Sequence, residues 1–172
     1  MERNITIVDE SNKVTGSARR IDAHNKGFWH RIAVVHIFNP QGQIFIQKRS
    51  PHADTSPNMW DHSAAGHVDE GEEPEDAAKR ELYEELGVKA DRLTFISLYK
   101  TQRVEKDKTF NRFWYVYKYI FDGEMKLEKS EVSTGKFVDV GWLKKDIKER
   151  SDLYTDGLKA SFDVYLESLA AN

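Results

Sequence analysis

The most constraining feature of this sequence is residues 66–88, GHVDEGEEPEDAAKRELYEELGV, in which nine of 23 residues are Asp or Glu. Pro74 suits the first turn of a helix, where its missing N–H costs nothing. Gly87 is typical of the residue that follows a helix. We therefore predict a helix over residues 74–86, directly after an acidic loop.

One face of this predicted helix is acidic. At 100° per residue, Glu81, Glu84 and Glu85 fall within an arc of about 100°, and an adjoining apolar stripe can face the core. Glu81 and Glu85 stand one turn apart, a like-charge spacing that costs a few tenths of a kcal/mol in an isolated helix. A hard divalent cation such as Mg²⁺ or Mn²⁺ would remove that cost, because it prefers several oxygen ligands. The alternative is an ordinary solvated acidic face.

The spacing of the fixed residues in this stretch decides between these interpretations. A match at all nine fixed positions is expected by chance on the order of once per 10⁹ windows. The pattern resembles the signature of the Nudix hydrolases, which implies an α/β fold: an α/β/α sandwich with a mixed β-sheet. The matching residues are Gly66, five residues, Glu72, seven residues, Arg80-Glu81-Leu82, one residue, Glu84-Glu85, one residue, and Gly87-Val88.

The resemblance assigns a role to each side chain of the motif. Glu81, Glu84 and Glu85 match the ligands of a divalent metal, Mg²⁺ or Mn²⁺, and are also catalytic. Gly66 matches a residue whose backbone lies close to that metal. The pair Glu72 and Arg80 matches a structural brace between loop and helix.

The general base is left open by the resemblance. Some Nudix enzymes use a glutamate of the motif, and others use a glutamate in a later loop. Glu131, six residues before Phe137 in EVSTGKF, resembles the second kind. An ordinary loop acid is an equal alternative.

Two flanking stretches, residues 14–31 and 47–68, resemble a branch that contains isopentenyl-diphosphate isomerases and related hydrolases. Arg20 and Arg49 match basic residues that hold the substrate diphosphate there, and guanidinium groups recognise phosphate well. His24, His30 and His67 resemble the histidines of the isomerase metal site. We expect a structural role for the first two and a substrate contact for His67.

Both proton-transfer groups of the isomerase are missing from this sequence. Ala65 occupies the position of the isomerase cysteine, and the strand candidate TFNRFWYVY has no acid where the isomerase needs a glutamate. Isomerisation of an unactivated alkene requires an acid and a base on opposite faces. We therefore expect metal-dependent hydrolysis of a phosphoanhydride in a small diphosphate-containing substrate, a nucleoside diphosphate or one linked to another group. The alternatives are the isomerase and a non-catalytic nucleotide-sensing module.

Composition limits the kinds of binding partner and the cellular compartment that we expect for this protein. The 172 residues suit a single domain over 1–172, and the net charge of −3 gives no general attraction to a nucleic acid polymer or membrane surface. The absence of cysteine excludes thiol chemistry. No signal peptide or membrane span is evident, so we expect a cytoplasmic protein. Whether two chains form a homodimer stays open.

The rest of the chain is predicted from periodicity and turn residues. We expect hairpins over 5–20 and 31–50 and further strands at 93–101, 112–121 and 135–143, with a charged loop at 102–109. Helical spacing at 142–149 and 153–170 predicts terminal helices. The second helix should bury Leu153, Leu158, Phe162, Tyr165, Leu166 and Leu169, and we expect the aromatic residues Phe45, Trp60, Phe113 and Trp114 to pack rather than stack a base.

Overall fold

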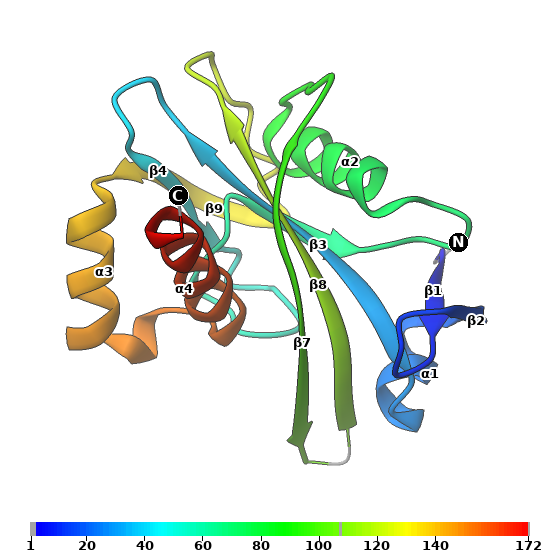
Figure 1. Cartoon of the computed structure of the whole chain (residues 1–172). Helices are drawn as coiled ribbons and strands as arrows, with labels where there is room; N and C mark the ends of the chain where they lie inside the picture. The colour runs from blue at the N-terminus through cyan, green and yellow to red at the C-terminus, as the bar shows by residue number, and fades with distance from the viewer. Residues whose placement is uncertain (1–2, 107, 172) are drawn as a thin grey trace.

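The computed structural model describes residues 3–106 and 108–171 and contains one mixed β-sheet with helices on both faces (Figure 1). This arrangement confirms the expected α/β class. The strands are β1 (Asn4–Val8), β2 (Val14–Arg19), β3 (Trp29–Phe38), β4 (Ile44–Arg49), β5 (Trp60–Asp61), β6 (Ala64–His67), β7 (Thr94–Glu105), β8 (Lys108–Ile120) and β9 (Val132–Val138). The helices are α1 (Arg20–Lys26), α2 (Pro74–Leu86), α3 (Val140–Glu149) and α4 (Asp156–Ala170), with a 3₁₀ turn at Ser151–Leu153.

Strand β3 is the centre of the sheet. Its whole length pairs in parallel with β8, from Trp29↔Asn111 to Phe38↔Ile120. Along its other edge it pairs with β1, then with β6, and finally with β4 at Phe38↔Ile44. The loop that follows the short strand β6 therefore starts in the middle of the sheet, next to β3, the most buried strand.

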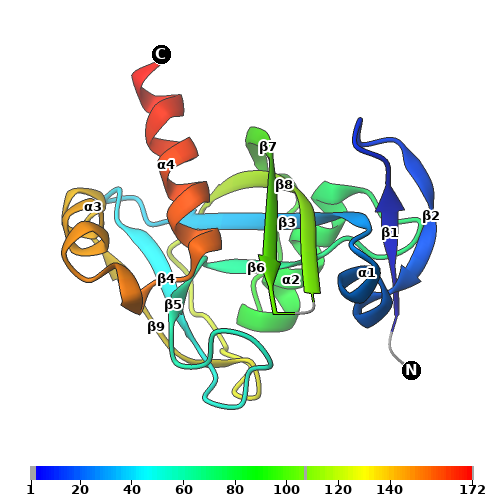
Figure 2. The same ribbon diagram turned by 90° about the horizontal axis from the view of Figure 1, so that it is seen from below.

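The two faces of β3 carry separate cores. Ala33, Val35 and Ile37 pack with the apolar side of α2, whereas Ile32 and Val34 pack with Trp114 and Val116 of β8 on the other face. Helix α4 covers part of this second face, next to a core formed by the ends of β3 and β4. Figure 2 shows α2 and α4 on opposite sides of β3.

The predicted helix over 74–86 and the two hairpins are confirmed, but several predicted boundaries are wrong: α3 and β9 begin before the predicted residues 142 and 135, and α4 begins after residue 153. Residues 102–105 and 108–109, expected as loop, continue β7 and β8 into a solvent-exposed ribbon. The strand expected over 135–143 ends at Val138, because Asp139 caps α3 by accepting a hydrogen bond from the Trp142 amide at 2.9 Å. Helix α1 was not predicted.

The predicted apolar stripe of the last helix is correct only in its middle. Leu158, Phe162 and Tyr165 are buried, and Leu166 packs against them. Leu153 and Leu169 are exposed, because they lie before the helix begins and at its last turn. The four aromatic residues do pack, with Phe45, Phe113 and Trp114 buried and Trp60 partly buried. Within residues 3–106 and 108–171, no helix is long and apolar enough to span a membrane.

Candidate functional site

The loop between β6 and α2 is braced by one arginine. Arg80 donates from Nε and Nη2 to the two carboxylate oxygens of Glu72, both at 3.0 Å, and from Nη2 to the His67 carbonyl at 2.9 Å. Both side chains are mostly buried. Bidentate pairs of this kind fix geometry as well as supplying energy. The brace thus holds the start of α2 against the end of β6.

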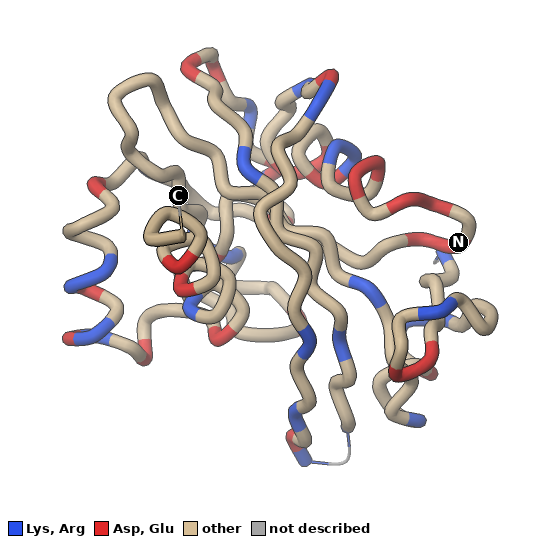
Figure 3. Tube along the Cα trace, viewed as in Figure 1, with Lys and Arg blue, Asp and Glu red and all other residues tan. Residues whose placement is uncertain are grey.

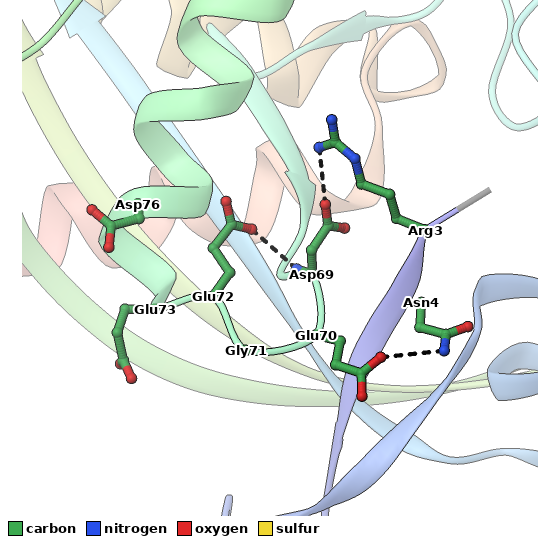
Figure 4. A pocket seen from close by; sticks show the side chains of 8 residues that line it. All are labelled: Arg3, Asn4, Asp69, Glu70, Gly71, Glu72, Glu73 and Asp76. Carbon is green, nitrogen blue, oxygen red and sulfur yellow. Dashed lines mark hydrogen bonds and ion pairs between the residues drawn. The ribbon is translucent and has the colours of Figure 1, made fainter. Parts of the chain in front are cut away.

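Other acids of this loop also hold it in place (Figure 4). Glu72 accepts the Asp69 amide at 3.1 Å, Arg3 Nη1 lies 3.1 Å from Asp69 Oδ2, and Asn4 Nδ2 donates to Glu70 at 3.3 Å. The shallow hollow that they line lies on the outer side of the loop. Figure 3 shows Asp and Glu repeated along this loop and into α2.

Gly66 on β6 has a steric role. A Cβ atom there would lie 1.9 Å from Glu81 Oε1 and 2.1 Å from Glu81 Cδ. Real Cβ atoms never approach so closely, so only glycine leaves room for this carboxylate beside the strand. Helix α2 can therefore present Glu81 at the side of β6, although the helix itself lies behind the sheet.

Glu81 and Glu85, the carboxylates beside Gly66, are largely buried, and their negative charge is only partly balanced by their neighbours. Burial raises the pKa of Glu81 to about 7, with further contributions from Glu84 and Glu131, against the attraction of Arg80. Glu85 is 5% exposed, and burial followed by the charge of Glu81 raises its pKa well above its usual value. Like charges in a desolvated site disfavour ionisation in this way.

Hydrogen bonds hold these carboxylates in their present positions. Arg80 Nη1 donates to Glu81 at 2.6 Å and to Glu84 at 3.1 Å, while Gln47 Nε2 donates to Glu85 at 2.6 Å. Among the residues described, the three carboxylates do not bring one oxygen each within 4.8 Å of one another. Their donor set nevertheless fits a hard divalent cation, since Glu85 is a buried acid whose hydrogen-bond donor is an uncharged amide.

These carboxylates form one wall of a cleft of about 1030 Å³. Its other walls come from the segment before β9, from β5, from α4 and from the exposed ribbon of β7 and β8. Of the residues predicted for the site, the cleft brings together Arg20, Arg49, Gly66, His67, Arg80, Glu81, Glu84, Glu85 and Glu131. Glu72 stays outside, on the far side of the brace.

The two arginines predicted to bind the diphosphate both reach the cleft already paired. Arg49 donates to Asp61 at 3.0 Å and to the Thr55 carbonyl at 2.9 Å. Arg20 donates to the exposed Asp54 at 3.1 Å. Asp61 is an acid that the sequence interpretation missed. Burial opposes its ionisation, but His62, Arg49 and Thr155 together hold its pKa well below its usual range.

The three histidines His24, His30 and His67 come together from α1, β3 and β6. Their ring centroids are 5.2 to 5.5 Å apart, and one ring nitrogen of each lies within 4.8 Å of the other two. Burial, with the nearby Arg112, lowers the pKa of His24 to about 4 and of His30 to about 3, and lowers that of His67 well below its usual value. All three are therefore neutral at pH 7.

Arg112 is the functional candidate that sequence reasoning did not single out. It lies between Phe110 and Trp114 on β8, all three facing the cleft. The available signal was a charged residue at an alternate position of a strand, between the aromatic residues Phe110 and Trp114.

Comparisons with known proteins agree with the geometry. A sequence model of the NUDIX domain matches residues 28–156. An uncharacterized Nudix hydrolase of Listeria monocytogenes is 35% identical over 133 residues, covering 77% of each chain. An isopentenyl-diphosphate Delta-isomerase 2 of Aromatoleum aromaticum is 28% identical, covering all of this chain and 91% of its own. A crystal structure of a Deinococcus radiodurans protein superposes with a TM-score of 0.74 and 28% identity, covering 94% of this chain and 99% of its own.

Proposed function

The chain belongs to the Nudix hydrolase family, and we propose that it hydrolyses a phosphoanhydride bond in a small diphosphate-containing substrate, with Mg²⁺ or Mn²⁺ as cofactor. A nucleoside diphosphate, or a nucleoside diphosphate linked to another group, is the substrate class that we favour. The observation that carries the proposal is the group of Glu81, Glu84 and Glu85 beside Gly66, in which Glu85 is buried and Glu81 mostly buried while Glu84 is exposed. Its negative charge is suited to a divalent cation and through it to a diphosphate.

The acidic residues of the cleft are proposed to hold the metal and to accept a proton. Mg²⁺ or Mn²⁺, when bound by Glu81, Glu84, Glu85 and the Gly66 backbone, supplies charge neutralisation on the phosphate oxygens and lowers the pKa of a water molecule. Glu131 is exposed at the cleft, close enough to raise the pKa of both Glu81 and Glu85, and can accept a proton from the attacking water.

The basic residues of the cleft are proposed to position the substrate. Arg49 is held by Asp61 and Thr55, so its guanidinium is oriented before the substrate arrives. Arg20 and His67 line the same cleft and supply further contacts to phosphate oxygens. Orientation of the diphosphate by fixed donors is a large part of catalysis in phosphoryl transfer.

A substrate panel tests the proposal. Nucleoside di- and triphosphates, nucleotide sugars, dinucleoside polyphosphates, coenzyme A and prenyl diphosphates are incubated with each metal, and released phosphate and monophosphate are measured. The double variant Glu84→Gln, Glu85→Gln should lose turnover by at least about a hundredfold. Glu167→Gln, an exposed acid on α4, is the matched control. Undiminished turnover in the double variant would refute the proposal.

The isomerase is the second candidate, because full-length relatives carry that name. Two observations oppose it: the residue before Gly66 is Ala65, and β8 contains neither Asp nor Glu between Lys108 and Ile120. An isomerase would interconvert isopentenyl and dimethylallyl diphosphates without releasing phosphate. A non-catalytic nucleotide sensor would bind nucleotides tightly but turn over no member of the panel.

A further inference from the structure

Arg112 lies on the cleft face of the sheet, beside the three histidines. In the parallel pairing of β3 with β8 it is directly opposite His30, so the two side chains are on the same face. Its Cζ atom lies 4.5 Å from the centre of the Phe110 ring and 5.6 Å from that of Trp114. The guanidinium thus lies against two aromatic rings that line the cleft with it.

The charge of Arg112 has no carboxylate partner among the residues described. Its Nε atom is buried without a hydrogen-bond partner. Burial, with the nearby Arg103 and Arg20, lowers its pKa to about 10, so it stays charged at neutral pH. Cation–π contacts offset only part of the cost of desolvating a charge. The other cleft arginines all have an acid within 3.1 Å: Arg3–Asp69, Arg20–Asp54, Arg49–Asp61, Arg80–Glu72 and Arg103–Asp156.

The neighbouring histidines also offer unpaired polar atoms. The Nε2 atoms of His24, His30 and His67 are buried and have no hydrogen-bond partner among the residues described. His30 Nδ1 lies 3.0 Å from the Phe28 carbonyl, so it carries the proton and Nε2 of that ring can only accept. His24 and His67 can each turn an N–H toward the space between the rings.

A metal ion is a poor fit to this group. Three imidazoles alone would suit zinc, but β8, the strand beside them, contains neither Asp nor Glu and contributes Arg112 instead. Its positive charge lies close to all three rings, where it repels a cation. Asn111, next to it, faces away and donates to the Gly27 carbonyl.

We propose that Arg112, with His24 and His67 as further donors, forms an anion subsite for a terminal phosphate group. A phosphate that keeps one hydroxyl proton also satisfies His30 Nε2. The subsite lies close to the carboxylates, since His67 follows Gly66, which contacts Glu81. In the hydrolase proposed above, on which this role rests, it selects substrates with a terminal phosphate close to the phosphate that the metal contacts.

Metal-free phosphate binding tests the subsite independently of hydrolysis. Inorganic phosphate is titrated calorimetrically into protein freed of metal by a chelating resin, which removes any contribution from a metal on the carboxylates. We expect one site per chain, weakened roughly tenfold or more by Arg112→Gln and less by Arg112→Lys. Lys145→Gln, at an exposed lysine of α3, is the control of equal charge change and should bind as the unmodified protein does.

Two results would overturn the subsite. One is absence of phosphate binding, or binding that Arg112→Gln leaves unchanged. The other is uptake of Co²⁺, seen by its visible absorption, that is lost in His24→Ala, since the pocket would then hold a cation. If Arg112→Gln does not fold, the shifts of the His24 and His67 ring resonances on phosphate addition to the unmodified protein replace it, and unmoved resonances contradict the proposal. Failure of the hydrolase proposal alone would leave phosphate binding intact.

Discussion

Replacing Glu81 by Gln should stabilise the metal-free protein at alkaline pH while destroying its activity. The pKa of Glu81 rises from an ordinary 4.5 to about 7 in the folded chain, and the side chain is only 13% exposed. A folded pKa above the unfolded one contributes stability that is complete below pH 4.5 and is lost as pH rises through 7. The ionised carboxylate therefore weighs against folding above neutral pH.

The size of this effect follows from the two pKa values. Between pH 5 and pH 8 the unmodified protein should lose about 2 to 3 kcal/mol of folding free energy through this one group. Gln keeps the shape and can still accept from Arg80, but it does not ionise. For a chain of this size the advantage of Glu81→Gln at pH 8 corresponds to a melting temperature about 5 to 10 °C higher.

Urea unfolding at pH 5, 6, 7 and 8 in metal-free buffer measures this difference directly. The free energies of Glu81→Gln and the unmodified protein should nearly coincide at pH 5 and separate as pH rises. Glu167→Gln, the exposed control, should stay parallel to the unmodified protein throughout. Two results would show that the surroundings of Glu81 do not disfavour its ionisation. One is a Glu81→Gln protein that is less stable than the unmodified protein at pH 8, and the other is a difference in unfolding free energy that does not change with pH.

Three further substitutions test the supporting structure. Gly66→Ala should displace the Glu81 carboxylate, lowering kcat by about a hundredfold or more, with loss of the Mg²⁺-induced rise in melting temperature. Arg80→Lys cannot make the bidentate bond to Glu72, so unfolding in urea should show a loss of about 1 to 3 kcal/mol and proteolysis should open the loop after β6 first. Asp61→Asn should destabilise by about 3 kcal/mol at pH 7. Because the pKa of Asp61 is depressed, its contribution is lost as pH falls, and the two proteins should converge in acid unfolding curves.

The parts of the fold that were predictable depend on signals close together in the chain. Pro74 and Gly87 mark the ends of α2, and Gly87 adopts φ 67° as the helix end requires. Beyond residue 101 the charged residues Arg103 and Glu105 favour a loop, whereas the structure continues β7 and β8 there as a ribbon. Both residues are exposed on the ribbon, which Figure 1 shows extending past the neighbouring elements. Charged residues indicate exposure to solvent, but an exposed segment can still be a strand when it belongs to a two-stranded ribbon.

The same distinction applies to the candidate site: residues close together in the sequence were predictable as a group, and residues far apart were not. The carboxylates and their brace lie within one motif, so spacing alone placed them together. The grouping of His24, His30 and His67 needs α1, β3 and β6 to meet, and the position of Arg112 opposite His30 depends on the pairing of residues 82 positions apart in the sequence. Periodicity gives the face of a strand but not its partner.

Strand β6 lies between two groups of opposite charge, the carboxylates of α2 and Arg112 of β8. Gly66 leaves space for an acid of α2, and His67, one residue later, stacks on His30 and lies close enough to Arg112 for that charge to lower its pKa further. A substrate with a single phosphate group could satisfy only one of these, whereas a chain of phosphates can meet the carboxylates through a cation and the guanidinium directly. If both proposed sites act on one substrate, their short separation along β6 favours a compact polyphosphate over a substrate whose charges are far apart, and substitution of Arg112 should then change substrate choice most.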